Sequence, residues 1–141
     1  MNGKQLNLFA PGLAVEYAIK EAMQIAAKES GLSRAQIVDE MEKLAGRSGV
    51  KLNTGSAARL TEDMLDKWLN PQESERMIPL KSLVIFCRVV GSLAPYRVML
   101  APLEAEVISG EDVILLQWAK AQQRIKEERK RLRRLEMQIS G

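Results

Sequence analysis

The sequence predicts an all-α protein, a compact helical bundle followed by one long basic helix. Apolar residues recur at helical spacing in several segments, whereas alternating stretches typical of strands are sparse. N-cap residues, glycines and prolines separate these segments where helices commonly begin and end. With 141 residues, 46% of them hydrophobic and 28% charged, the chain has the size and balance of one globular domain with a tail.

The first expected helix spans residues 13–29, and Gly31 is expected to end it. Its polar residues, expected outside the buried stripe, are Glu16, Lys20, Glu21 and Lys28. Its predicted buried stripe, at helical spacing, consists of Val15, Ile19, Ala22, Met23 and Ala26.

The second expected helix begins at Ser33, because Ser33 and Gln36 have the spacing of a capping box. Gly46 is expected to end it. Residues 46–59 then change character, since glycine, serine, asparagine and threonine favour a loop, with an extended piece at 50–52. The cationic residues of this loop are Arg47, Lys51 and Arg59, and the loop contains no acidic residue.

The third expected helix, residues 61–69, has Thr61 as its N-cap and ends before Pro71. The fourth opens with Pro79, closes at Gly91, and has so few polar residues that burial on most sides is expected. Three residues are expected in the core because each lies on an apolar face: Phe86 and Cys87 of the fourth helix, and Trp68 of the third.

A short fifth helix is expected from Ala94 to about Ala101, followed by a strand or extended link at residues 103–109. The last expected helix runs from Glu111 to about Ile139. We therefore predict a helical bundle at residues 1–108, with a DNA-binding region at about 32–91, and an oligomerisation helix at 109–141.

Charge and composition restrict the chemistry. Residues 1–110 contain equal numbers of cationic and acidic residues, so the net charge of +3 belongs to residues 111–141. Histidine is absent and Cys87 is the lone cysteine, which excludes Ser-His-Asp and Cys-His catalysis and the common zinc modules. Asp63 and Asp66 form a surface carboxylate pair without the other parts of an active site, so no enzyme, cofactor, metal or small-molecule substrate is expected.

Targeting signals are also not expected. The N-terminal segment lacks the apolar core of a signal peptide, and no run of about 18 apolar residues could cross a membrane. A single cysteine points to a reducing compartment. We therefore expect a cytoplasmic protein.

The segment LTEDMLDKWLNPQESERMIPLKSLVIFCRVVGSLAP contains a helix that ends in Leu69, Asn70 and Pro71, a polar turn at 72–76, and a hydrophobic helix that ends at Gly91. In this arrangement, residues 32–91 resemble the lambda-repressor-like helix-turn-helix family, and more narrowly the phage regulatory proteins of the CII-like type. The resemblance implies that the helix at 33–45 is the first of the pair and that the helix at 61–69 enters the major groove. The connection between them, residues 46–60, is longer than the usual turn.

A DNA-binding role for this region requires side chains that read base edges and cations that neutralise phosphates. Asparagine and threonine can reach bases from the loop, and carboxylates can accept hydrogen bonds from cytosine. The same residues could instead form a solvated, N-capped helix after a loop. The expected DNA-binding residues are Arg47, Lys51, Asn53, Thr54, Arg59, Thr61, Glu62 and Lys67.

The terminal helix has two interpretations. Its eight cations could bind phosphate, and its apolar residues recur at spacings of four and three, which is typical of a coiled-coil seam interrupted by Glu128. The sequence favours burial of this apolar seam against a partner chain. The alternative is that the helix packs on its own domain and forms solvent-exposed ion pairs such as Glu127 with Arg131. The expected oligomerisation residues are Ile114, Trp118, Ile125, Leu132 and Leu135.

Together these features predict a double-stranded-DNA-binding transcriptional regulator, of phage or prophage type, that acts as a homodimer or higher oligomer. In a symmetric dimer the two half-sites would be about 34–36 Å apart. The alternative is an interaction protein, antitoxin-like or an adaptor, that uses the terminal helix to hold a partner other than nucleic acid.

Overall fold

The structure, a computed structural model, describes residues 12–52 and 58–140. Within these ranges the chain is helical and has no strand, which confirms the predicted all-α class. The chain divides into two units at residues 107 and 108.

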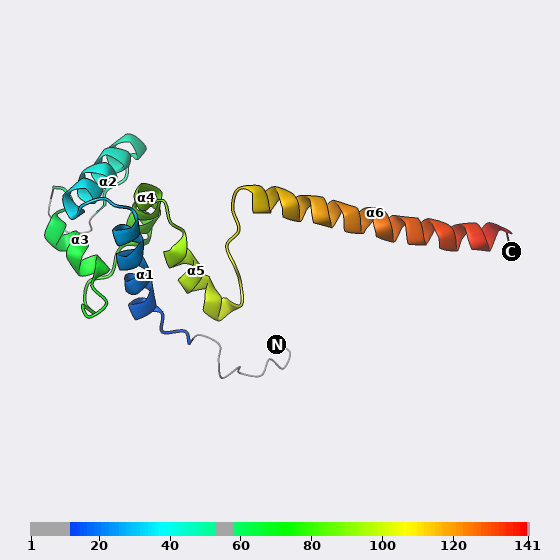
Figure 1. Ribbon diagram of the computed structural model, residues 1–141, viewed down its shortest axis with the longest axis horizontal. Coiled ribbons are helices and arrows are strands. Elements are labelled where there is room, and N and C mark those ends of the chain that lie inside the picture. Colours follow the sequence, from blue (N-terminus) through cyan, green and yellow to red (C-terminus); the bar gives the residue numbers. More distant parts are fainter. Residues whose placement is uncertain (1–11, 53–57, 141) are drawn as a thin grey trace. The chain divides into compact units, whose positions relative to one another are not determined.

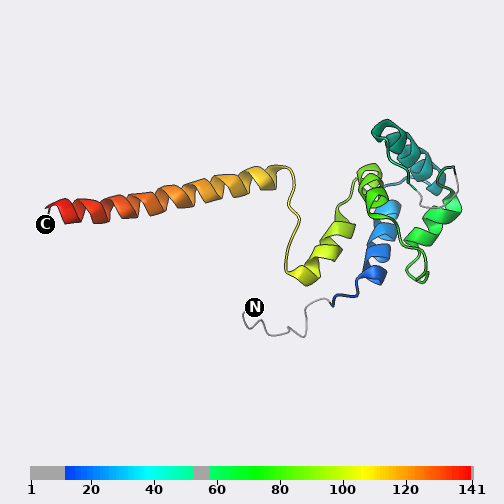
Figure 2. The same cartoon turned by 180° about the vertical axis from the view of Figure 1, so that it is seen from behind.

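The first unit is a bundle of short helices (Figures 1 and 2). α5 packs along α1, α2 contacts both α3 and α4, and α1 also contacts α3 and α4. The second unit consists of one long helix, α6 (Glu111–Ser140), and the residues that precede it. The helices of the first unit are α1 (Glu16–Glu29), α2 (Arg34–Ser48), α3 (Glu62–Leu69), α4 (Leu80–Val90), α5 (Ala94–Leu100) and the 3-10 helix η1 (Ala101–Leu103).

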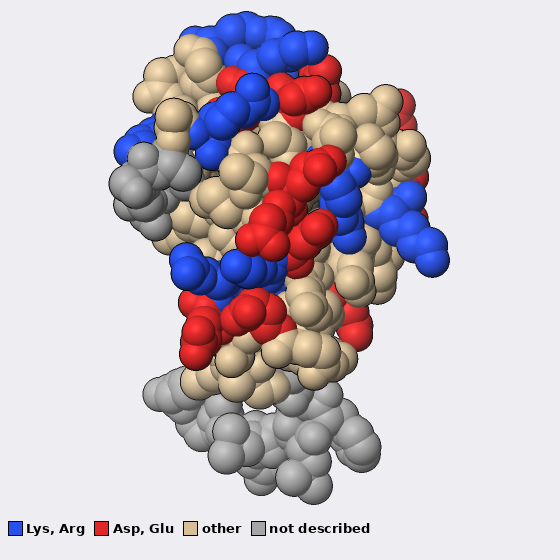
Figure 3. Space-filling model, turned by 90° about the vertical axis from the view of Figure 1, so that its left-hand side faces the viewer, with Lys and Arg blue, Asp and Glu red and all other residues tan. Residues whose placement is uncertain are grey.

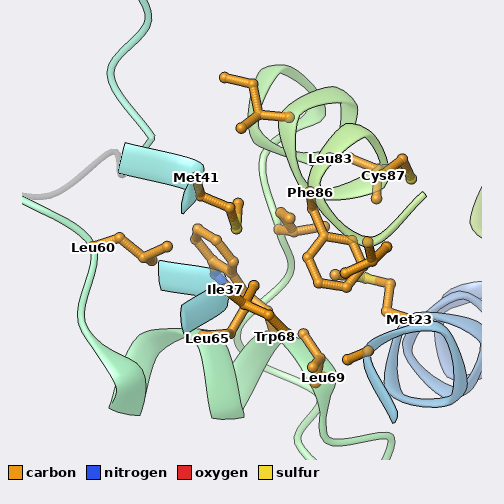
Figure 4. Close-up of a cluster of buried hydrophobic side chains, with 14 of the residues drawn as sticks. Met23, Ile37, Met41, Leu60, Leu65, Trp68, Leu69, Leu83, Phe86 and Cys87 are labelled. Atoms are coloured by element: carbon orange, nitrogen blue, oxygen red, sulfur yellow. The ribbon is translucent and has the colours of Figure 1, made fainter. Parts of the chain in front are cut away.

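The helices α1, α2, α3 and α4 share one hydrophobic core. Figure 4 shows Trp68 of α3 directed toward Met41 of α2, and Phe86 of α4 directed toward Met23 of α1. Trp68, Phe86 and Cys87 are all buried, as the apolar faces predicted. Because all four helices contribute to this core, α3 is held in a fixed position on the bundle rather than attached by its ends alone.

The predicted helix starts are confirmed at two places. The Ser33 hydroxyl accepts from the backbone N–H of Gln36 at 3.1 Å, and the Gln36 side chain accepts from the backbone N–H of Ser33 at 2.8 Å. Thr61 caps α3 by accepting from the backbone N–H of Met64 at 3.2 Å. Gly31 and Gly91 follow their helices in the left-handed conformation that favours glycine.

The predicted end of α2 is wrong by three residues. The helix passes through Gly46 and ends at Ser48, because Gly49 has the positive φ of 68° that the C-cap requires. The backbone N–H of Val50 then donates to the carbonyl of Ala45 at 2.9 Å. Gly46 is compatible with a helix interior at a modest cost in stability, so its presence alone did not mark the end.

Neither extended segment forms a strand. At residues 50–52 the Leu52 side chain is instead buried in the core, and the Ser82 hydroxyl of α4 donates to the Leu52 carbonyl. Residues 104–110 connect the two units without a strand. A strand needs a partner in a sheet, and the described residues offer none.

The expectation that α4 is buried on most sides is confirmed, since six of its eleven residues are buried, but one narrow face of the helix is exposed. α4 begins at Leu80, with Pro79 just before it, and Leu80 and Val84 expose 74% and 60% of their surface. Arg88 continues this exposed stripe one turn further along the helix. The apolar composition of α4 exceeds what its core-facing side needs, and the composition alone did not show which residues face outward.

Cys87 gives a direct test of the core. Its burial raises the pKa of the thiol to about 11, so at pH 8 almost none of it is the reactive thiolate. We expect alkylation by iodoacetamide at pH 8 to be slow in the folded protein and rapid in urea. One rapidly modified thiol per folded chain, measured by mass spectrometry, would contradict this packing.

Tyr96 of α5 gives a second test. Its hydroxyl is buried and has no hydrogen-bond partner among residues 12–52 and 58–140, and burial, reinforced by nearby Cys87, raises its pKa. An unsatisfied buried hydroxyl is costly, so Tyr96→Phe should increase the free energy of unfolding by about 1 kcal/mol. Urea denaturation measures this change, with Tyr17→Phe as the exposed control. A loss of stability in Tyr96→Phe would show that the hydroxyl is satisfied.

Candidate nucleic-acid interface

α3 presents two different faces. Leu65, Trp68 and Leu69 are buried in the core. Glu62, Asp63 and Asp66 lie at the other helical positions and are exposed. Helical periodicity produces this division, since residues three and four apart share a face. A short helix is thus packed firmly on one side and accessible on the other, which is the geometry a groove-binding helix needs.

The entry to α3 is fixed by acidic residues of α2. The Glu42 carboxylate accepts from the backbone N–H of Leu60 at 2.7 Å, and the Leu60 side chain is buried. The Arg59 guanidinium lies 3.2 Å from the Asp39 carboxylate and 4.0 Å from that of Glu42. These contacts fix the backbone directly before the Thr61 cap.

Two ion pairs lie on the exposed side of α3. Arg34 of α2 donates to Asp66 at 3.0 Å, and Lys67 lies 3.1 Å from Asp63. Exposed pairs of this kind contribute at most about 1 kcal/mol each and weaken with salt. They orient side chains on the surface, whereas the hydrophobic core stabilises the fold.

The expectation that Lys20 lies outside the buried face of the first helix is wrong. It is only 2% exposed, and its ammonium group donates to the carbonyls of Lys67 and Arg76. Burial lowers its pKa, while the carboxylates of Glu73 and Glu16 act in the opposite direction. A cation at the C-terminal carbonyls of a helix is stabilising, so Lys20 holds the end of α3 and the turn that follows it.

The predicted cations differ in their surroundings. Arg47 and Lys51 are exposed and form no ion pair within the described part of the chain. Arg59 and Lys67 are already paired with acidic residues, so phosphate would have to compete for them. Thr61 and Glu62 are exposed at the start of α3, while Asn53 and Thr54 lie outside the described residues.

Two cations near this region were not predicted. Arg88 of α4 lines a shallow depression together with Arg47 and Glu40. Arg34 reaches α3 through Asp66. No local pattern indicated either residue, because each depends on which helices pack together.

The surface of this region is electrostatically mixed. Figure 3 shows acidic side chains across the middle of the visible face, with Lys and Arg above, beside and below them. Further acidic side chains lie near the top and below the lower cations, so the cations do not form one uninterrupted basic area. On such a mixed surface, cations can contact phosphates while neighbouring carboxylates offer hydrogen-bond acceptors to bases.

α6 has no buried residue along its 30 residues. All five expected oligomerisation residues are exposed, and they occupy one face at heptad spacing. In place of the Glu127–Arg131 pair that the alternative interpretation included, Arg131 approaches Glu128 at 3.5 Å and Glu127 accepts from Gln123 at 3.2 Å. The apolar face of α6 is therefore accessible to a partner.

Comparison with protein-family models, curated proteins and solved structures gives no match. Among the described residues, no helix is long and apolar enough to cross a membrane, and no group of acidic or cysteine side chains could hold a metal ion.

Proposed function

We propose that this protein is a sequence-specific double-stranded-DNA-binding regulator, in which α3 enters the major groove and α6 joins two copies. The mechanism is binding without covalent chemistry. The main support is the placement of α3, which is buried on one face, anchored at both ends and exposed on the other face. Its packing against α2 fits the predicted helix pair, with residues 49–61 as a long connection.

The division of roles follows from the exposed side chains. Thr61 and Glu62 lie at the N-terminal end of α3, the end from which a recognition helix commonly contacts bases. A carboxylate there can accept from the amino group of cytosine but repels phosphate. Arg47, Lys51 and Arg59 precede α3 and provide the phosphate contacts. Specificity and affinity would therefore come from different segments.

A gel-shift titration tests this proposal with random and selected duplexes at several salt concentrations. If a dimer neutralises about six phosphates, the logarithm of the binding constant should fall with the logarithm of salt concentration at a slope of about −5. Absence of binding at micromolar protein and low salt would contradict the proposal.

Lys51→Ala should weaken binding to all duplexes, because phosphate contacts do not depend on base sequence, and it should leave the melting temperature unchanged, because Lys51 is exposed. Arg59→Ala should weaken binding in the same way and slightly lower the melting temperature, because it also removes the ion pairs with Asp39 and Glu42. Arg97→Ala is the matched control, since Arg97 is exposed on α5, which packs on α1. Glu62→Gln should instead alter the preference among duplexes. Equal effects of Lys51→Ala and Arg97→Ala would place the DNA contact elsewhere.

A second candidate is an interaction protein that binds no nucleic acid. The exposed acidic residues of α3 and the paired state of Arg59 and Lys67 favour it. The core lies entirely in the first unit, so a chain truncated before Glu111 retains every buried side chain. If this chain is monomeric, α6 is the assembly helix. If it remains dimeric and loses only DNA affinity, α6 is a phosphate-binding arm.

A further inference from the structure

We infer that the partner of α6 is a second copy of α6 in antiparallel orientation. This inference rests on the part of the proposed function that assigns self-association to α6. The apolar face of α6 is exposed, and no segment within the described part of the second unit covers it. A 30-residue helix in water gains most of its stability from packing such a face.

The seam has eight positions at alternating spacings of four and three residues, and seven of them are apolar. Two identical helices can pair through this seam in either direction. The order of the side chains and the distribution of charge along the helix distinguish the two directions. The seam positions are Ile114, Trp118, Ala121, Ile125, Glu128, Leu132, Leu135 and Ile139.

In a parallel pair each seam residue faces its own copy. Trp118 would meet Trp118 next to a layer in which Ala121 meets Ala121, so a crowded layer would adjoin an underfilled one. Glu128 would meet Glu128, which places two carboxylates together in the seam. Like charges held in an apolar seam are costly unless each is neutralised.

In an antiparallel pair the seam is complementary to itself about its midpoint. Trp118 then faces Leu135, and Ala121 faces Leu132, so large and small residues alternate across the interface. Glu128 faces Ile125 instead of another carboxylate, while its own Arg131 lies 3.5 Å away. All eight positions find a partner within the length of the helix.

Charge along α6 favours the same orientation. Residues 111–123 have a net charge of −1, whereas residues 124–140 have a net charge of +4. A parallel pair places the two strongly basic halves side by side. An antiparallel pair places each basic half beside the acidic beginning of the other helix, which lowers repulsion.

In the antiparallel orientation the N-termini of the two α6 helices, each of which follows the first unit of its own copy, lie far apart. A 30-residue helix is about 45 Å long, so two fully overlapping antiparallel helices have their N-termini about 45 Å apart. In a parallel pair these ends would be adjacent.

The first test is the mass of the full chain in solution, measured by light scattering for three proteins. The wild type should be a dimer. Leu132→Lys should raise the dissociation constant at least tenfold, and Met137→Lys should leave it unchanged. Met137 is a matched control because it lies on the same helix outside the seam and is more exposed than Leu132, at 73% against 56%. A monomeric or tetrameric wild type, or equal effects of the two substitutions, would overturn the inference.

The second test determines the orientation by disulfide formation in the full chain. Ile114→Cys and Ile139→Cys should cross-link when the two variants are mixed and exchange subunits, and each should cross-link poorly alone. Rapid cross-linking of Ile114→Cys with itself would overturn the antiparallel pair. The native Cys87 can remain, because it is buried.

Gel shifts on the same preparations separate this inference from the proposed function. A dimer with the expected cross-links that binds no DNA supports the inference and contradicts the regulator. A monomer that binds DNA through α6 contradicts the inference and leaves DNA binding in place.

Discussion

Replacing Phe86 with alanine is expected to lower the free energy of unfolding by about 3–5 kcal/mol, the largest loss that we expect from a single substitution in this protein. The Phe86 side chain is fully buried between α1 and α4 (Figure 4). Its removal loses apolar burial and leaves a cavity that the neighbouring helices can close only in part.

Urea denaturation measures this loss, with the slope of the transition unchanged if the unfolded state is unaffected. Val84→Ala is the control, because Val84 lies on the same helix and is largely exposed. It should change the free energy of unfolding by less than about 0.5 kcal/mol. A loss below about 1 kcal/mol in Phe86→Ala would mean that α4 does not form the centre of the core.

Lys20→Ala is expected to cost about 2 kcal/mol, the typical value for a hydrogen bond from a charged donor. The ammonium group of Lys20 serves two carbonyls, that of Lys67 at the end of α3 and that of Arg76 in the following turn. Without it both carbonyls lose a buried partner and α3 loses its C-terminal anchor. The same variant should therefore bind DNA more weakly if α3 is the recognition helix.

Lys28→Ala is the matched control for Lys20, since Lys28 lies on α1 and is exposed. Lys20→Met separates the two contributions of the side chain, because it keeps the aliphatic stem and removes the charge. Its stability should lie between those of the wild type and Lys20→Ala. A melting temperature of Lys20→Ala equal to that of the wild type would show that the two carbonyls accept hydrogen bonds from water instead.

The burial of Lys20 also predicts a pH dependence. Its pKa is lower in the folded than in the unfolded protein, so between these two values the unfolded chain binds more protons. Stability from this group therefore rises as pH increases through the folded pKa and levels off above the unfolded value, 10.5. Lys20→Met should remove this rise in the alkaline range.

The resemblance to helix-turn-helix proteins and the geometry of α3 agree in one respect and differ in another. The third helix has the expected cap, buried face and exposed face. The basic residues around it are less available than their number in the sequence indicated. Arg59 lies in a loop without acidic residues, yet the fold places Asp39 of α2 3.2 Å from its guanidinium. Charge counted along a segment cannot include acids brought in from another helix.

Much of the helical architecture follows from local rules in the sequence. Periodic apolar residues marked the buried face of α1, and the caps at Ser33 and Thr61 marked two helix starts. These features depend on residues at most four positions apart, so local stereochemistry is sufficient to determine them. The heptad spacing of α6 is of the same kind.

The tertiary structure decided the features that depend on distant partners. Lys20 is buried because carbonyls 47 and 56 residues away accept hydrogen bonds from its ammonium group, and α2 continues past Gly46 because the chain turns at Gly49. Arg59 and Arg34 are paired by acids on neighbouring helices. A polar side chain is buried or exposed according to whether the fold supplies a partner, and that partner cannot be identified from the residues beside it in the sequence.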